Sequence, residues 1–196
     1  LNALRPSAAL ALGVGLSLAG LTVLLLIGPL PAAIAALSWV LYNLVYTPLK
    51  TKTTACTAIG AIPGALPPLM GFTAAANEIT MVAWALFAMQ FLWQFPHFLA
   101  IAWMYRDQYR QAGIKMLPAV EPDGRITVRQ IVMFTIMLVP VSLAPFFFAT
   151  DGIIYLVGAV LLGVWFLWAS VKTARTKTNE SARALLLVSV IYLPLL

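Results

Sequence analysis

Charged side chains are scarce in this sequence. Asp, Glu, Lys and Arg make up 9% of its 196 residues, whereas 62% are hydrophobic. Soluble domains carry roughly 25% charged residues, so this composition excludes an ordinary water-soluble domain. Cysteine and histidine occur once each, as Cys56 and His97, which excludes an internal disulfide and a cysteine-rich metal site. The sequence instead has long apolar runs separated by short polar segments, which is typical of a protein that crosses a membrane several times.

Two further features are missing at the ends of the sequence. It does not begin with methionine, and no basic segment followed by a short apolar one marks a signal peptide. Its last residues lie inside an apolar run. We therefore expect residues 1–196 to form a single transmembrane domain that belongs to a longer membrane protein.

Seven apolar stretches predict an all-α, polytopic helical bundle, because a membrane-spanning helix needs about 20 residues. Gly28 and Pro29 predict the break between the first two spans. The third span contains Pro63, Pro67 and Pro68, so we expect a kinked or partly unwound helix whose backbone is satisfied by neighbouring protein or a polar cavity. The predicted spans cover residues 7–27, 30–48, 53–77, 80–105, 130–149 and 153–171, and a seventh begins at residue 184.

With seven spans, all 12 Lys and Arg residues fall on one side of the membrane. The loops of the other side hold only Glu78 and Asp151, the latter in a predicted tight turn at residues 150–152. The positive-inside rule makes the basic side cytoplasmic. We therefore expect a multi-pass protein of the plasma (inner) membrane, bacterial rather than mitochondrial, and no nucleic-acid partner. The basic residues are Arg5, Lys50, Lys52, Arg106, Arg110, Lys115, Arg125, Arg129, Lys172, Arg175, Lys177 and Arg183.

The first candidate for chemistry is a group of tyrosine, lysine and threonine side chains after the second span. Tyr46 and Lys50 are four residues apart and share one helix face, and Lys52 follows. Lysine ammonium groups among hydroxyls suit an anionic ligand such as a diphosphate. The alternative is that the two lysines only set the topology at a helix end.

The second candidate continues the fourth span into the polar segment 106–129. Asp107 offers a carboxylate for Mg²⁺, with diphosphate oxygens completing the coordination shell. Arg106, Arg110 and Lys115 offer positive charge for a phosphate group. An ordinary solvated loop is the alternative interpretation.

The third candidate is the only histidine. His97 follows Pro96 inside the fourth span, and an ionisable residue at membrane depth is a functional hypothesis by default. A neutral histidine that bridges two helices is an equally good interpretation. Gln90 and Gln94 lie on a related helix face and favour a polar cavity.

In order along the chain, these motifs resemble the protohaem IX farnesyltransferase family (haem O synthases) of the UbiA superfamily of intramembrane prenyltransferases. The resemblance rests on Tyr46-x-x-x-Lys50, on the Gly/Pro stretch of residues 60–71, on Trp93-Gln94-x-Pro96-His97-Phe98, and on Tyr105-Arg106-x-x-Tyr109-x-x-Ala112-Gly113-x-x-Met116-Leu117-Pro118. It covers most of the chain, and the Gly/Pro stretch and the block from Pro96-His97-Phe98 to Met116-Leu117-Pro118 are specific to the haem branch.

The resemblance implies a nine-helix fold around a central cavity, of which the seven predicted spans are the last seven. It also implies two Asp-containing motifs that bind Mg²⁺ and farnesyl diphosphate. The first motif is absent, and residues 1–6 would follow it directly; we therefore expect little activity from this chain alone. The second maps onto Asp107. A quinone-type member more often has a second Asp where this chain has Gln111, which favours the haem branch.

The implied reaction is transfer of the farnesyl group of farnesyl diphosphate to a vinyl group of haem B, giving haem O. By this resemblance Asp107, Lys50 and Tyr46 are the predicted catalytic residues, with Asp107 also the predicted metal ligand. The predicted diphosphate contacts are Lys52, Arg106 and Arg110, and His97 is predicted to place the haem, as an axial ligand. Implied partners are the lipid bilayer and either haem A synthase or the assembly of a terminal oxidase.

Two other functions compete with this prediction. A UbiA-type enzyme that prenylates an aromatic quinone precursor would share the helices and the diphosphate site. A small-molecule transporter also has broken helices and an intramembrane histidine. However, its charged residues should lie near mid-membrane, whereas here they gather at one side.

Overall fold

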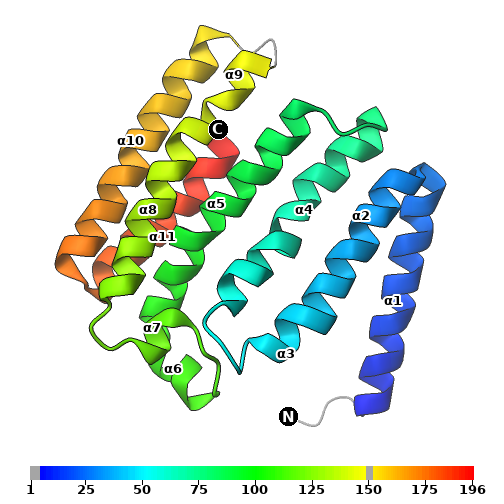
Figure 1. The fold of residues 1–196 in the computed structure, drawn as a ribbon, viewed down its shortest axis with the longest axis horizontal. Coiled ribbons are helices and arrows are strands. Elements are labelled where there is room, and N and C mark those ends of the chain that lie inside the picture. Colours follow the sequence, from blue (N-terminus) through cyan, green and yellow to red (C-terminus); the bar gives the residue numbers. More distant parts are fainter. Residues whose placement is uncertain (1–4, 149–151) are drawn as a thin grey trace.

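The computed structural model describes residues 5–148 and 152–196, which form helices and turns and contain no strand. The predicted turn at 150–152, with Asp151, and residues 1–4 fall largely outside this part. Most of the long helices run alternately up and down across the molecule (Figure 1). The all-α polytopic bundle is thus confirmed. The elements are α1 (Pro6–Ile27), α2 (Pro29–Val40), η1 (Leu41–Tyr46), α3 (Thr47–Leu49), α4 (Cys56–Ala76), α5 (Met81–Met104), α6 (Arg106–Gln111), α7 (Leu117–Val120), α8 (Arg125–Ser142), α9 (Ala144–Phe148), α10 (Ile153–Thr176) and α11 (Asn179–Leu195).

The predicted count of seven spans is not confirmed. Within the described residues, six helical segments are long and apolar enough to cross a membrane, the second of them running through η1 and α3 as Pro29–Leu49. The predicted seventh span is α11, which is helical but has 17 residues. The length and apolar composition of these six segments make the chain a multi-pass membrane protein.

Helix α5 lies at the centre of the bundle and packs against α4, α8 and α11. The buried residues of α5 are mainly apolar and of mixed size, which lets three helices pack against it. Leu99 and Ala100, for example, are fully buried. The main core lies between α5, α8, α10 and α11, where Leu138, Phe166 and Tyr192 are also inaccessible. Helix α1, by contrast, packs against α2 and has no buried residue.

Helix α4 stays helical through its three prolines. Of the two alternatives predicted for this span, a kinked or a partly unwound helix, the partly unwound one is therefore not found. Each proline lacks an N–H and leaves the carbonyl four residues earlier without its helical donor. The Ser38 hydroxyl of α2 donates to one of these, the Pro63 carbonyl, at 3.2 Å. The expectation that neighbouring protein satisfies this backbone is met at that position.

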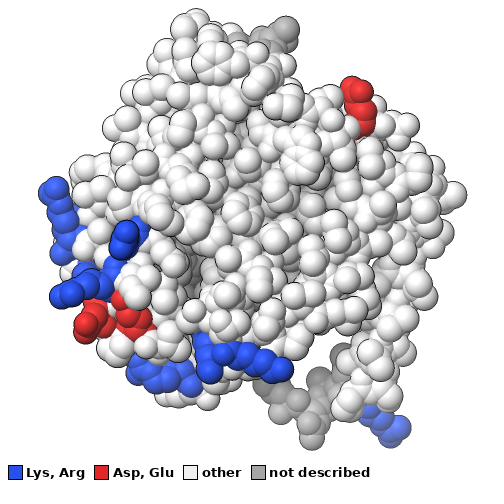
Figure 2. All heavy atoms as spheres, in the orientation of Figure 1, with Lys and Arg blue, Asp and Glu red and all other residues white. Residues whose placement is uncertain are grey.

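Basic side chains gather at one end of the bundle, which we call the basic end (Figure 2). It contains Arg5 before α1, the turn between α3 and α4, the segment from α6 to the start of α8, and the turn between α10 and α11. Glu78, in the turn between α4 and α5, lies at the opposite end. The predicted one-sided charge is therefore present in the fold.

Candidate active site

A cavity of about 990 Å³ lies between α1, α2, α4 and α5 and reaches the basic end. Apolar side chains of α1 and α2 form much of its wall, and polar side chains form a smaller part of it. The polar residues along it are Ser17, Ser38, Tyr42, Asn43, Tyr46, Lys50, Thr57, Gln94 and Tyr109. A cavity of this size is at the upper end of the range of roughly 300–1,000 Å³ for small-molecule sites.

Tyr46 and Lys50 both line this cavity, as their spacing predicts. Tyr46 ends the π-helical segment η1, and its ring lies against Gly60 of α4 and 5.3 Å from the ring of Tyr42. A Cβ at position 60 would come within 2.7 Å of Tyr46 Cδ2, so glycine is required for this close approach. Lys52, in contrast, is exposed and is not part of the cavity wall.

The two predicted polar clusters meet at the basic end of the cavity. The backbone N–H of Lys115 donates to the Lys50 carbonyl at 2.8 Å. Below this link, the Thr57 hydroxyl donates to the sulfur of Met116 at 3.7 Å, and both residues line the cavity. Ile114 and Met116 of the segment after α6 thus form the wall of the cavity near Lys50, and Tyr109 of α6 contributes to the same wall.

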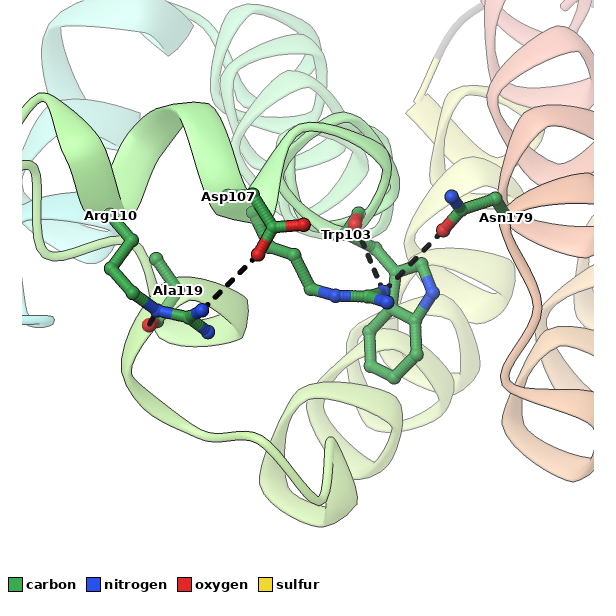
Figure 3. A network of polar contacts seen from close by, with 6 residues as sticks. Trp103, Asp107, Arg110, Ala119 and Asn179 are labelled. Carbon is green, nitrogen blue, oxygen red and sulfur yellow. Dashed lines mark hydrogen bonds and ion pairs between the residues drawn. The ribbon is translucent and has the colours of Figure 1, made fainter.

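Asp107 and Arg110 form an ion pair on α6, outside the cavity wall (Figure 3). Their closest oxygen and nitrogen are 3.2 Å apart, and the two side chains are 67% and 54% exposed. Arg110 also donates through Nε to the Ala119 carbonyl at 3.2 Å, which ties α6 to α7. The carboxylate is accessible and lines neither this cavity nor a second, smaller one.

Arg106 contacts neighbouring helices and is not part of the cavity wall. The guanidinium carbon of Arg106 lies 5.2 Å from the ring centroid of Trp103. A guanidinium N–H of Arg106 donates to the side-chain oxygen of Asn179, at the start of α11, at 3.4 Å. Arg106 therefore fastens α6 to the neighbouring helices in this structure. The structure does not bring Lys52, Arg106 and Arg110 together at the cavity.

The residues that the structure describes contain no group of three or more His, Cys, Asp or Glu side chains placed to hold a metal ion. Asp107 could contribute a single carboxylate to Mg²⁺. Magnesium commonly binds through one or two carboxylates together with water and substrate phosphates, so a single exposed carboxylate fits a shared site of that kind.

His97 bridges two helices. Its Nδ1 lies 2.8 Å from the Ser189 hydroxyl of α11, and its ring stacks on Trp93 with centroids 4.4 Å apart. Trp93 donates to the Ser189 carbonyl at 2.7 Å. This is the bridging geometry that the sequence left open, and His97 is not part of the cavity wall. Its predicted contact with haem stays a prediction.

Sequence reasoning singled out Gln90 and Gln94 together, but the structure separates them. Gln94 lines the large cavity, whereas Gln90 lines a second one of about 480 Å³ near Pro145 and Leu193. Ser38, Asn43 and Tyr109 were missed as cavity residues. Tyr109 lies in a motif that carried the resemblance, whereas nothing in the sequence around Ser38 or Asn43 distinguishes it from other polar residues in apolar helices.

Comparison with known proteins identifies the family. The profile of the UbiA prenyltransferase family matches residues 2–191. The chain belongs to this family. No solved structure matches it.

Three bacterial relatives, each named "Protoheme IX farnesyltransferase", illustrate the similarity of this UbiA family member. The protein of Solibacter usitatus is 53% identical over 189 residues, which are 96% of this chain and 65% of that relative. That of Koribacter versatilis is 48% identical over 174 residues, 85% of this chain and 56% of the relative. That of Salinibacter ruber is 46% identical over 153 residues, 78% of this chain and 54% of the relative. The chain thus spans about three fifths of the length of these relatives.

Proposed function

We propose that this chain carries the intramembrane site of a prenyltransferase that moves the farnesyl group of farnesyl diphosphate to a vinyl group of haem B, giving haem O. The observation that carries the proposal is the large, mainly apolar cavity that ends at Lys50 on the basic end. Membership of the UbiA family supports the reaction class. The name shared by the relatives supports farnesyl diphosphate and haem as the substrates.

Lys50 would hold the diphosphate at the basic end of the cavity. Its ammonium group is a compact charge that stabilises the negative charge of the leaving diphosphate as the allylic C–O bond breaks. Tyr46 and Tyr109 bring phenol groups to the same wall. The farnesyl chain would lie along the apolar faces of α1, α2 and α4, where water is excluded from the allylic cation.

Asp107 is the proposed ligand to Mg²⁺, together with oxygens of the bound diphosphate. When bound, the ion would neutralise charge on the leaving group. Arg110 already pairs with this carboxylate, so α6 places a positive and a negative group beside the end of the cavity. Lys52 and Arg106 stay predicted contacts of the diphosphate, and His97 stays a predicted contact of the haem. Unlike Lys50, these three residues do not line the cavity.

The basic end is proposed to face the cytoplasm, because positively charged loops are retained on that side. Farnesyl diphosphate would then reach the site from the cytoplasm, and haem B from the bilayer. A plasma-membrane location and partners in haem A synthesis or terminal oxidase assembly are part of the same proposal.

The test is product formation by the whole gene that encodes this chain. Membranes from a bacterial strain without its own haem O synthase, expressing this gene, should convert haem B and farnesyl diphosphate into haem O, detected by mass spectrometry of extracted haem. The same membranes should not prenylate 4-hydroxybenzoate. Prenylation of 4-hydroxybenzoate instead of haem would support the quinone-type alternative. Absence of farnesyl diphosphate binding would remove the prenyltransferase proposal and leave the transporter.

A further inference from the structure

Gln94 presents a fixed hydrogen-bond acceptor to the cavity. Its side-chain nitrogen donates to the Ala61 carbonyl at 3.0 Å and to the Gln90 carbonyl at 3.1 Å. Both amide hydrogens are therefore used, which fixes the orientation of the amide. The oxygen Oε1 lies against Gly64, in the space that a side chain at position 64 would need. Gln94 is only 3% exposed, yet it lines the cavity, so this oxygen is a polar acceptor in a mainly apolar wall.

Ser38 presents a second acceptor on the same wall. Its hydroxyl hydrogen is donated to the Pro63 carbonyl, which has no helical donor because residue 67 is proline. Its oxygen can then only accept a hydrogen bond from a ligand. Ser38 and Gln94 approach α4 at neighbouring positions, at Pro63 and at Ala61 and Gly64, and all of these except Ala61 line the cavity.

Ser38 and Gln94 together offer two acceptors and no free donor, so they select a ligand with O–H groups. Water is the smallest such ligand, and a water that donates both hydrogens turns its lone pairs away from the wall and toward the cavity. The position at which Gln94 contacts α4 bears on the reaction as well. Gly64, beside Gln94, is four residues and about 6 Å along α4 from Gly60, beside Tyr46. A water held at Gln94 would therefore lie about one helical turn deeper in the cavity than Tyr46.

We propose that Gln94 and Ser38 bind and orient the water that completes haem O formation. This inference rests on the proposed function. The vinyl π electrons form a C–C bond with the farnesyl carbon as its C–O bond to diphosphate breaks, which leaves a cation on the vinyl carbon next to the porphyrin. The oriented water forms a C–O bond to that carbon, and the proton it loses is taken up by the released diphosphate. Without the water, the cation loses a proton and an unhydrated alkenyl product forms.

The test measures the ratio of hydrated to unhydrated farnesyl haem, which differ by one water in mass. The variants are Gln94→Met, which keeps the side-chain length without the acceptor, and Ser38→Ala. The control is Gln90→Met, on the same helix but facing the second cavity. All are made in the whole gene, and extracted haems are analysed by mass spectrometry. We expect the unhydrated fraction to rise at least tenfold in Gln94→Met, to rise in Ser38→Ala, and to stay at the wild-type value in Gln90→Met.

The outcomes separate the inference from the function on which it rests. If the wild type forms no farnesylated haem, the proposed function is wrong. If the wild type forms haem O and both variants keep the wild-type product ratio, the water site is wrong. If Gln94→Met forms no product at all, the ratio in Ser38→Ala decides: an increase in the unhydrated fraction supports the site, and an unchanged ratio overturns it.

Discussion

The backbone N–H of Lys115 donates to the carbonyl of Lys50 at 2.8 Å, although the two residues are 65 positions apart. This bond joins the turn after α3 to the segment after α6. It places the lysine that lines the cavity next to the polar segment that carries Asp107. Two of the segments that carry predicted site residues are therefore joined directly at the basic end.

Lys50 is expected to contribute to diphosphate binding. Lys50→Met should weaken binding of farnesyl thiodiphosphate, an unreactive analogue, by tenfold or more, since a hydrogen bond to a charged group contributes about 1.5–3 kcal/mol. Isothermal titration in detergent measures the effect. Lys172→Met is the matched control, because Lys172 lies over the Trp168 ring on α10, away from the cavity. Equal loss of affinity in both variants would mean that only the overall charge matters.

Asp107 is expected to be needed for turnover but not for folding. Asp107→Asn should reduce haem O formation by the whole gene product about a hundredfold, comparable to the loss of one preorganised electrostatic group. Membrane insertion should be unchanged, because the side chain is exposed. Asp123→Asn changes the charge of another exposed carboxylate and should keep activity. Near-normal turnover in Asp107→Asn would remove Asp107 from the site.

Gly60 is expected to be required for the place of Tyr46. Gly60→Ala should destabilise the protein by about 1–3 kcal/mol, since the new methyl group overpacks against the tyrosine ring. Gly71→Ala, on the same helix, has nothing within 4 Å of the added atom and should be neutral or stabilising. Thermal unfolding in detergent compares the two variants. Equal melting temperatures would contradict the close contact.

Glu121 gives the basic end a pH dependence. Partial burial alone would raise the pKa of Glu121, but hydrogen bonds from the N–H groups of Ile126 and Thr127 and from the Thr127 hydroxyl, with the charge of Lys177, hold this pKa below its usual value. A lowered folded-state pKa adds stability above the unfolded-state pKa of about 4.3. That stability is lost as the pH falls through the folded-state pKa.

Glu121→Gln should therefore lower the unfolding temperature at pH 7, by an amount that corresponds to about 1 kcal/mol for a lost helix cap. The difference from the wild type should shrink as the pH falls below the unfolded-state pKa and through the lower folded-state pKa, where the native carboxylate also becomes protonated. Circular dichroism during heating at pH 7 and at a series of lower pH values measures this. Glu78→Gln at the opposite end is the control. A difference that persists unchanged at low pH would show that the charge is not the cause.

His97 is expected to act between α5 and α11. Single and double variants of His97→Ala and Ser189→Ala should show a coupling free energy of about 1 kcal/mol in thermal unfolding, because the hydrogen bond is lost in either single variant. Titration with haem B provides the second readout. A Soret band that changes in His97→Ala but not in Ser189→Ala would support the haem contact predicted from the sequence.

The helices and the one-sided charge could be predicted from the sequence because both follow from local composition. The breaks at Gly28-Pro29 and at Asn77 are where expected, and Asn77 ends α4 in a left-handed conformation. The state of α4 could not be predicted, because whether a proline-rich helix unwinds depends on donors such as Ser38 from another helix. The predicted seventh span, α11, is helical but has 17 residues. It therefore does not add to the six segments that are long and apolar enough to cross a membrane.

The candidate site could be predicted in part. Tyr46 and Lys50 share a helix face, and that spacing was sufficient to bring both to the cavity. The direction of Arg106 depends on Asn179, which is 73 residues away, and that of His97 depends on Ser189. Contacts of this kind are set by helix packing, so residue type and spacing along α5 and α6 do not reveal them.

Two glycines on α4 have a consequence for how this site can change. Tyr46 fills the space beside Gly60, and Gln94 fills the space beside Gly64. A larger residue at either glycine position is therefore compatible only with a smaller or displaced partner. Among relatives, positions 46 and 60, and positions 64 and 94, should covary in pairs, and a redesign of the cavity for a bulkier or shorter prenyl chain would have to exchange both members of a pair together.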